Sequence, residues 1–238
     1  MNWPATCAVV IPCRNEAGVI AGLVREVRPH LPLVLVVDDN SEDETAARAA
    51  EAGAQVVRRT ENPGKGAALK AGVAAARARG CEWVMTLDGD GQHRPEDIPA
   101  FLRCAEETDA ALVVGNRMHR AEAMPWLRRQ ANRWISRRLS ELVGSSLPDS
   151  QCGFRLINLK AWAALRLETD HFEIESEALV AFVGAGHRVE FVPIQVVVGG
   201  GQSHIRPVRD TWRWLRWWRR VRREPRMAAG AAASQSKG

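Results

Sequence analysis

Short runs of apolar residues alternate with longer, mixed stretches over the first half of the chain. The short runs predict strands, because unbroken apolar segments of this kind are typical of a sheet that is covered on both faces. The mixed stretches between them predict helices. We expect strands at Cys7–Pro12, Leu33–Asp38, Gln55–Val57, Glu82–Asp88 and Ala110–Gly115, and helices at about Glu16–Val27, Asp43–Ala52, Lys65–Arg79 and Pro95–Glu107.

This alternation predicts an α/β fold with a mostly parallel central sheet and helices on both faces, because right-handed crossovers place each helix against the sheet. Ligands of such sheets bind beyond the carboxyl ends of the strands. Three polar clusters directly follow predicted strands, namely Arg14–Glu16, Asp38–Asp43 and Asp88–His93. We therefore expect these clusters to meet in one crevice.

The alternation fades after Gly115. A basic helix is expected at about Pro125–Val143, another helix near Phe172–Val183, and a strand within Arg188–Val198. We divide the chain into a domain at residues 1–205, a basic Trp/Arg-rich amphipathic segment at 206–226, and a low-complexity, disordered tail at 227–238.

Composition and targeting signals restrict the setting of the protein. A chain of 238 residues that is 46% hydrophobic can bury a sizeable core. Its five cysteines are scattered without a C-x-x-C pair, which argues against disulfides or zinc and favours a reducing, cytoplasmic compartment. The N-terminus lacks the features of a signal peptide, and no segment approaches the ~18 apolar residues of a spanning helix. We expect a protein that lies on a membrane or in solution without crossing a membrane.

The charge is concentrated in two segments. The whole chain carries +5, yet Arg117–Arg138 holds seven arginines against Glu122, and Arg206–Arg226 holds nine arginines against two acidic residues. The rest of the chain is therefore net acidic. Local basicity of this kind indicates an anionic partner for these two segments.

The segment Asp88-Gly-Asp90-Gly-Gln92 places oxygen ligands at alternate positions after a strand. A calcium loop of the EF-hand type is excluded, because His93 and Pro99 stand where that loop requires glycine and glutamate. An acidic turn that caps a helix remains the simpler alternative. We favour a divalent cation, Mg²⁺ or Mn²⁺, held by one or two carboxylates together with substrate phosphates.

The cluster after the second strand contains two carboxylates with no capping role. Ser41 and Asp43 are candidate caps of the next helix, whereas Asp38 and Asp39 precede that position. Asp38 is expected to accept a hydrogen bond from a nucleobase, with Asp39 nearer the ribose or the metal.

Glu16 and Lys65 have evenly balanced interpretations. Glu16 stands at a helix start, where capping explains it as well as ligand binding does. Lys65 lies in a Gly-Lys-Gly sequence that lacks the upstream glycine and the Ser/Thr of a phosphate-binding P-loop. It either contacts a phosphate or base from a backbone nest or belongs to a plain turn.

The C-terminal basic segment predicts an amphipathic helix. Its apolar face contains Trp214, Leu215, Trp217, Trp218 and Val221, and arginines occupy the other face. Such a helix is typical of a membrane interface, and twelve residues span only ~18 Å. Packing of the tryptophan face on the domain and a nucleic-acid patch are the alternatives, of which nucleic acid is the weakest because the crevice is acidic. We favour the membrane surface.

Eight segments, taken together and in order, resemble the family 2 inverting glycosyltransferases with the GT-A fold, in the polyprenyl-phosphate (dolichyl-phosphate mannosyltransferase-like) branch. The resemblance covers residues 11–210 and is carried by IPCRNE, VVDDNSEDET, GKGAALKAG, TLDGDGQHRPEDIP, GNR, DSQCGFRL, FEIESEAL and SHIRPVRD. Arg14 departs from the family, since many relatives have tyrosine there. Membrane-spanning helices follow this domain in many relatives, and we do not expect them in this sequence.

The resemblance implies roles for individual residues. A divalent cation, Mg²⁺ or Mn²⁺, would be held by Asp88, Asp90 and Gln92, of which Asp90 and Gln92 would act in catalysis with Arg117. The nucleotide sugar would contact Pro12, Arg14, Glu16, Asp38, Asp39, Lys65, Asp88, Gln151 and Arg155. The acceptor phosphate would contact Arg117, Arg129, Arg133 and Arg206.

The resemblance further implies transfer of a hexose from a nucleotide sugar of the GDP-mannose or UDP-glucose type to a polyprenyl phosphate. The alternatives are transfer to a sugar or lipid hydroxyl, with Glu173 and Glu175 as candidate bases, and a non-catalytic module that binds nucleotide sugars. The expected partners are the donor, the lipid acceptor, a membrane surface, and a membrane protein or a second copy of the chain; nucleic acid is not expected. We expect a peripheral position on the inner, cytoplasmic face of the cell membrane.

Overall fold

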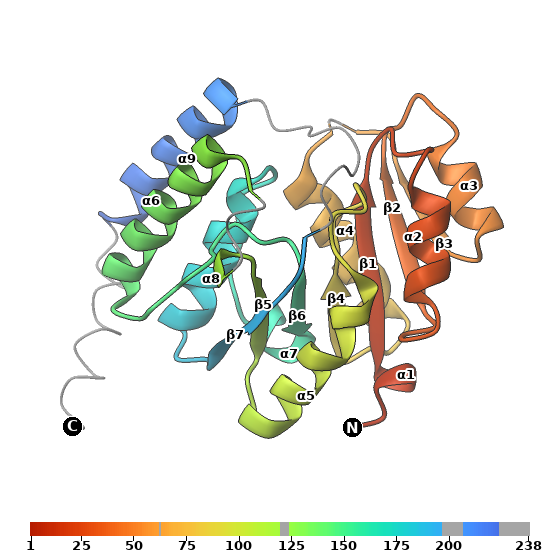
Figure 1. The fold of residues 1–238 in the computed structure, drawn as a ribbon, viewed down its shortest axis with the longest axis horizontal. Coiled ribbons are helices and arrows are strands. Elements are labelled where there is room, and N and C mark those ends of the chain that lie inside the picture. The colour runs from red at the N-terminus through yellow and green to blue at the C-terminus, as the bar shows by residue number, and fades with distance from the viewer. Residues whose placement is uncertain (62, 120–123, 197–206, 224–238) are drawn as a thin grey trace.

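A computed structural model describes residues 1–61, 63–119, 124–196 and 207–223 (Figure 1). The strands are β1 (Cys7–Cys13), β2 (Val34–Asp39), β3 (Gln55–Arg59), β4 (Trp83–Thr86), β5 (Leu112–Asn116), β6 (Arg155–Asn158) and β7 (Val189–Pro193). The helices are α1 (Trp3–Thr6), α2 (Ile20–Val27), α3 (Thr45–Glu51), α4 (Lys65–Ala78), α5 (Ile98–Thr108), α6 (Trp126–Val143), α7 (Leu159–Ala163), α8 (Glu173–Gly184) and α9 (Pro207–Val221), and the 3₁₀ turn η1 (Pro95–Asp97) leads into α5. The expected tail at 227–238 and the predicted phosphate ligand Arg206 lie outside the described residues.

In the described part of the chain, the strands form one sheet in the order β3-β2-β1-β4-β6-β5-β7. Every neighbouring pair is parallel except those that involve β6, which runs antiparallel to both β4 and β5. Strands β1 and β2 are buried along almost their whole length, and helices lie on both sides of the sheet (Figure 1). The predicted α/β fold with a mostly parallel sheet is confirmed.

Strand β6 was not expected from the sequence. Its first residue is Arg155, so the segment does not form an unbroken apolar run. The guanidinium of Arg155 is nevertheless buried, because it donates to the backbone carbonyls of Ser150, Cys152 and Glu175 at 2.8–2.9 Å. A buried polar group with all these partners is tolerated in a core strand, and no local pattern reveals that.

Close packing of α4 on the sheet depends on a small side chain. A Cβ atom at Gly72 would overlap the side chain of Val10 on β1 and approach Val37 on β2 to 2.9 Å. The glycine therefore allows the helix backbone to lie directly on the two central strands. This contact fixes the height of the α4 N-terminus, where Lys65 lies, above the sheet.

Helix α9 packs on the domain, against α8 and α6. Trp214 and Trp217 are only 5% and 4% exposed, and the indole Nε1 of Trp214 donates to Ser176 Oγ at 3.0 Å. The Trp214 ring also stands edge-on to Trp134 of α6, with centroids 5.5 Å apart. The predicted apolar face exists, but our preferred assignment of it to a membrane surface is corrected, because the domain covers its central tryptophans.

Among the described residues, none of the helices combines the length with the apolar content that crossing a bilayer requires.

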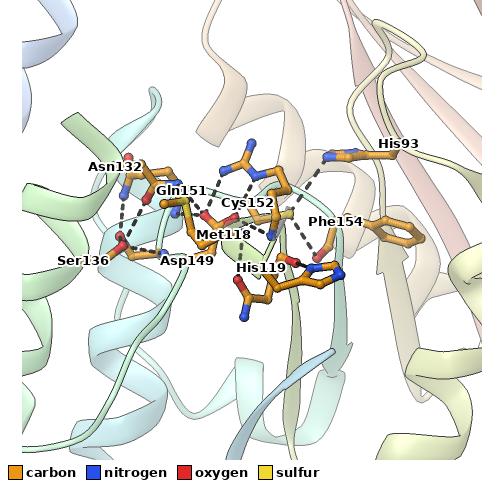
Figure 2. A network of polar contacts seen from close by, with 12 residues as sticks. His93, Met118, His119, Asn132, Ser136, Asp149, Gln151, Cys152 and Phe154 are labelled. Carbon is orange, nitrogen blue, oxygen red and sulfur yellow. Dashed lines mark hydrogen bonds and ion pairs between the residues drawn. The ribbon is translucent and has the colours of Figure 1, made fainter. Parts of the chain in front are cut away.

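A buried ion pair ties the end of β5 to the segment before β6. Arg117 donates to both carboxylate oxygens of Asp149, from Nε at 2.7 Å and from Nη2 at 2.8 Å. The Asp149 carboxylate also accepts from the Arg117 backbone N–H, from Asn132 Nδ2 and from the Gln151 backbone N–H. Figure 2 shows Asp149 beside Asn132 and Gln151. Burial acts to raise the pKa of Asp149, but the charge of Arg117 and the hydrogen bonds from Arg117 and Asn132 together outweigh it and hold that pKa below its usual range.

Asp149→Ala is expected to lower the free energy of unfolding by about 3–5 kcal/mol, because it leaves the Arg117 charge buried without a partner. Chemical denaturation measures this loss. The matched control is Glu141→Ala, which removes the exposed partner of Arg137 and Arg138 and should leave stability unchanged within error. The double variant Arg117→Met/Asp149→Leu should recover much of the loss. Equal stability of the Asp149 and Glu141 variants would contradict this account.

Candidate active site

A cavity of about 710 Å³ opens beyond the carboxyl ends of β1, β2 and β4. All three polar clusters contribute to it, through Arg14 and Glu16, through Asp39, and through Asp88 and Asp90. The expectation that these clusters meet in one crevice is confirmed. The other lining residues are Pro12, Cys13, Pro63, Gly64, Lys65, Ala68, Gly89, Arg128, Gln151, His171, Phe172, Glu175, Arg209 and Arg213.

The first two loops of the cavity are bound to each other. The Asn15 backbone N–H donates to Ser41 Oγ at 3.0 Å, and Asn15 Oδ1 accepts from the Glu42 backbone N–H at 2.8 Å. The Glu16 backbone N–H donates to Thr45 Oγ1, also at 2.8 Å. Asn15 has a φ of 55°, a conformation that asparagine tolerates better than most residues. The side chains after β1 and β2 therefore form one wall of the cavity.

The two consecutive aspartates at the end of β2 point to different surroundings. Asp39 lines the cavity, accepts from the Gly64 backbone N–H at 2.6 Å and forms an ion pair with Arg59. Burial raises the pKa of Asp39, against the opposing effects of Gly64 and Arg59. Asp38 does not line the cavity, and its carboxylate accepts from the Ser41 backbone N–H at 3.1 Å. Asp39 thus faces the cavity, whereas Asp38 supports the loop beside it.

Lys65 joins two carboxylates from distant parts of the chain. Its Nζ lies 2.6 Å from Asp88 Oδ1 and 2.5 Å from Glu175 Oε1, at the first residue of α4. Burial acts to lower the pKa of Lys65, but the two carboxylates raise it well above its ordinary value. Burial likewise acts to raise the pKa of Asp88, yet the neighbouring charges, chiefly the Lys65 ammonium, hold it well below its usual range. The ammonium and the Asp88 carboxylate are therefore both charged in the cavity.

Asp90 completes the acidic side of the cavity. Burial raises its pKa, and the negative charge of Asp88 acts in the same direction. Like charges brought together in a buried site favour a cation, so this pair of carboxylates fits a divalent ion. Gln92 is not among the cavity-lining residues, although its backbone N–H donates to Asp90 Oδ1 at 3.1 Å. In the described part of the chain, no group of three or more His, Cys, Asp or Glu side chains is placed to hold a metal ion.

The segment before β6 packs directly on Asp88. A Cβ atom at Gly153 would overlap the Asp88 carboxylate, so only glycine allows this approach. Two residues earlier, Gln151 lines the cavity, and its Nε2 donates to Ser176 Oγ at 2.9 Å. His93 is buried beside this loop. Its Nδ1 accepts from the Asp88 backbone N–H, and burial lowers the pKa of His93 to about 4. The imidazole is therefore neutral and supports the loop.

The structure places the predicted arginines differently from our expectation. Arg117 is paired with Asp149, Arg155 donates to backbone carbonyls, and neither Arg129 nor Arg133 is a lining residue of the cavity. Buried partners hold the guanidinium groups of Arg117 and Arg155. The cavity arginines are instead Arg128 of α6 and Arg209 and Arg213 of α9.

Sequence reasoning missed these three arginines for a physical reason. Arg128 adjoins Arg129 in an evenly basic helix, so only the packing of α6 decides which of them faces the cavity. Arg209 and Arg213 are four residues apart, which places them one above the other on a single helix face. That spacing was the available signal. The spacing alone does not indicate the cavity, because only the packing of α9 beside the site turns this helix face toward it.

Comparison with known proteins supports a common family. Residues 8–165 match the sequence model of glycosyl transferase family 2. The chain is 26% identical over 212 residues to the UDP-N-acetylglucosamine--dolichyl-phosphate N-acetylglucosaminyltransferase of Methanococcus voltae, covering 79% of this chain and 84% of the relative. It is 33% identical over 168 residues to the undecaprenyl-phosphate mannosyltransferase of Micrococcus luteus, covering 67% of this chain and 66% of the relative.

A similar fold occurs in a crystal structure of glucosyl-3-phosphoglycerate synthase from Mycobacterium tuberculosis in complex with Mn²⁺, UDP and phosphoglyceric acid. The TM-score is 0.70 at 21% identity, over 89% of this chain and 75% of that one. This likeness supports the GT-A fold. The family match includes the two acidic clusters after β2 and β4 that line the cavity. The chain therefore belongs to glycosyl transferase family 2 and is a glycosyltransferase related to enzymes that use polyprenyl phosphates.

Proposed function

We propose that this glycosyltransferase moves a hexose from a nucleotide sugar to the phosphate of a polyprenyl phosphate, with inversion at the anomeric carbon. The observation that carries the proposal is a single cavity lined by carboxylates from one part of the chain and by Arg128, Arg209 and Arg213 from another. The carboxylates suit the donor and its cation, and the arginines suit an anionic acceptor. The names of the two relatives, a dolichyl-phosphate and an undecaprenyl-phosphate transferase, support the same acceptor class.

The charge state of the cavity favours a phosphate over a hydroxyl as acceptor. A hydroxyl needs a general base, whereas a phosphate monoester is already largely dianionic at neutral pH, with a second pKa of ~6. Glu175 lines the cavity but is paired with Lys65 at 2.5 Å. Glu173 is buried and is not among the lining residues. Neither glutamate is thus arranged as a free base, and an acceptor that needs none fits better.

The donor would lie along the wall formed by the loops after β1, β2 and β4. Arg14, Glu16 and Asp39 would contact the nucleoside, with Pro12 beneath it. The ammonium of Lys65 would contact the diphosphate, and Gln151 would contact the sugar.

Asp88 and Asp90 would hold Mg²⁺ or Mn²⁺, as their shared burial and like charge favour. When bound, the cation would take up negative charge on the leaving diphosphate. Lys65 adds positive charge beside Asp88, and the cavity arginines would hold the acceptor phosphate near the donor. One phosphate oxygen of the acceptor would then bond to the anomeric carbon from the face opposite the diphosphate, as the bond between that carbon and the diphosphate oxygen breaks.

The setting follows from the acceptor. A polyprenyl tail resides in a bilayer, so transfer would take place at a membrane surface. All five cysteines are free thiols, namely Cys7, Cys13, Cys81, Cys104 and Cys152. Free thiols support a reducing compartment and hence the inner, cytoplasmic face of the membrane.

Acceptor choice tests the proposal directly. The chain is expected to glycosylate a short, water-soluble polyprenyl phosphate and to leave the corresponding polyprenol untouched, because neither Glu173 nor Glu175 is arranged as a free base. The assay follows release of the nucleoside diphosphate together with product mass, over a panel of GDP- and UDP-linked hexoses. Transfer to the polyprenol, with none to its phosphate, would point to a hydroxyl-directed enzyme instead.

Asp90→Ala is expected to lower kcat by at least about a hundredfold, because developing charge on the diphosphate loses its stabilisation. Isothermal titration should show the same variant losing Mn²⁺-dependent affinity for the nucleoside diphosphate. Glu96→Ala is the control, since Glu96 is an exposed carboxylate on η1. Full transfer activity in Asp90→Ala would remove the metal assignment.

Arg213→Ala is expected to raise the KM for the polyprenyl phosphate by roughly 10- to 100-fold, the worth of one charged hydrogen bond, with little effect on the KM for the donor. The control is Arg216→Ala on the same helix, because Arg216 is exposed and does not line the cavity. Initial-rate kinetics with each substrate varied in turn separate the two constants. An equal effect of both variants would show that only the overall charge of α9 matters.

A further inference from the structure

Exposed apolar side chains gather on two neighbouring helices. Within the described residues, the large apolar side chains that are strongly exposed, apart from Met1, all belong to α6 and α9: Trp126 at 65%, Leu127 at 74%, Trp134 at 46% and Trp212 at 60%. The two helices lie side by side at one edge of the molecule (Figure 1) and touch through the rings of Trp134 and Trp214. Leaving these four apolar side chains exposed is unfavourable if the surface meets only water.

The same two helices are strongly basic. Helix α6 carries five arginines against Glu141, and α9 carries five against Asp210. Two of the exposed rings have an arginine close to their face, with Arg138 5.8 Å from the centre of Trp134 and Arg216 5.8 Å from the centre of Trp212. Interleaved tryptophan and arginine suit the interface of a lipid bilayer, where anionic headgroups cover an apolar interior.

The exposed residues adjoin the cavity arginines along the chain. Leu127 directly precedes Arg128, and Trp212 directly precedes Arg213, and both arginines line the cavity. If Leu127 and Trp212 contact a lipid surface, the neighbouring cavity residues Arg128 and Arg213 lie close to the lipid headgroups. This arrangement matches an acceptor whose phosphate must enter the cavity while its tail stays in lipid.

We propose that the exposed side chains of α6 and α9, namely Trp126, Leu127, Trp134 and Trp212, form a docking surface for an anionic lipid bilayer. This surface differs from the tryptophan face predicted from the sequence, because Trp214 and Trp217 are buried against the domain. This inference rests on the proposed function in one respect: the polyprenyl-phosphate acceptor explains why the cavity should face lipid. The surface itself rests on exposure and charge, which give it a separate test.

Vesicle co-sedimentation of the whole chain tests the surface. Wild-type protein is expected to bind vesicles of equal parts phosphatidylcholine and phosphatidylglycerol, and to bind pure phosphatidylcholine less. The triple variant Trp126→Ser/Leu127→Ser/Trp212→Ser should lose about tenfold in partitioning, because binding scales with buried apolar area. Trp134 is left unchanged, since it packs on Trp214. Circular dichroism checks that the variant is folded.

Charge has its own matched pair of variants. Arg137 of α6 and Arg188 before β7 are both exposed and both paired with a glutamate, at 3.1 and 2.7 Å. Arg137→Gln should weaken binding to the phosphatidylglycerol vesicles, and Arg188→Gln should leave it unchanged. Raising the salt concentration should weaken wild-type binding, because it screens the attraction between arginines and lipid phosphates.

Several outcomes would overturn the docking surface. The triple variant could bind as well as wild type, or wild type could bind neither kind of vesicle. Light scattering can give a third such outcome. If the wild-type protein is a dimer, the triple variant is a monomer and neither binds vesicles, the surface is a contact between two copies of the chain.

Transfer to the water-soluble acceptor should be equal in wild type and triple variant. Vesicle binding without any such transfer would count against the proposed function and leave the surface standing.

Discussion

The active site depends on the buried ion pair between Arg117 and Asp149. Its carboxylate accepts hydrogen bonds from the end of β5, from Asn132 of α6 and from Gln151, so three separate segments share one anchor (Figure 2). One of them carries Gln151 into the cavity and continues to Gly153, which packs on Asp88. Another orients α6, whose first turn contributes Arg128. The same charge pair thus supports both Gln151 and Arg128 in the cavity wall.

Helix α8 provides a second junction, between the cavity and the C-terminal helix. The hydroxyl of Ser176 accepts from Gln151 Nε2 on one side and from Trp214 Nε1 on the other. One residue earlier, Glu175 holds Lys65 beside Asp88. Docking of α9 therefore places Arg209 and Arg213 in the cavity wall and also supports a residue that we assign to the donor sugar. The C-terminal helix is part of the site.

Much of the fold could be predicted because its signals are local. Buried parallel strands read as apolar runs, and the polar clusters that follow them must meet where the strands end. Strand β6 could not be predicted in this way, because Arg155 interrupts its apolar run and is satisfied only by carbonyls of Ser150, Cys152 and Glu175. A pattern of neighbours along the chain contains no information about such distant partners.

The sequence by itself determined the α/β class, the crevice and its acidic pair, Asp88 and Asp90, since strand order and local spacing suffice for these. Tertiary structure alone decided which arginines serve the cavity. Arg117 and Arg128 are equally basic residues in one basic segment, yet Asp149 pairs with the first and leaves the second to line the cavity. It also decided which tryptophans face outward, because a helical face can be read from spacing, but what covers that face depends on the packing of the rest of the chain.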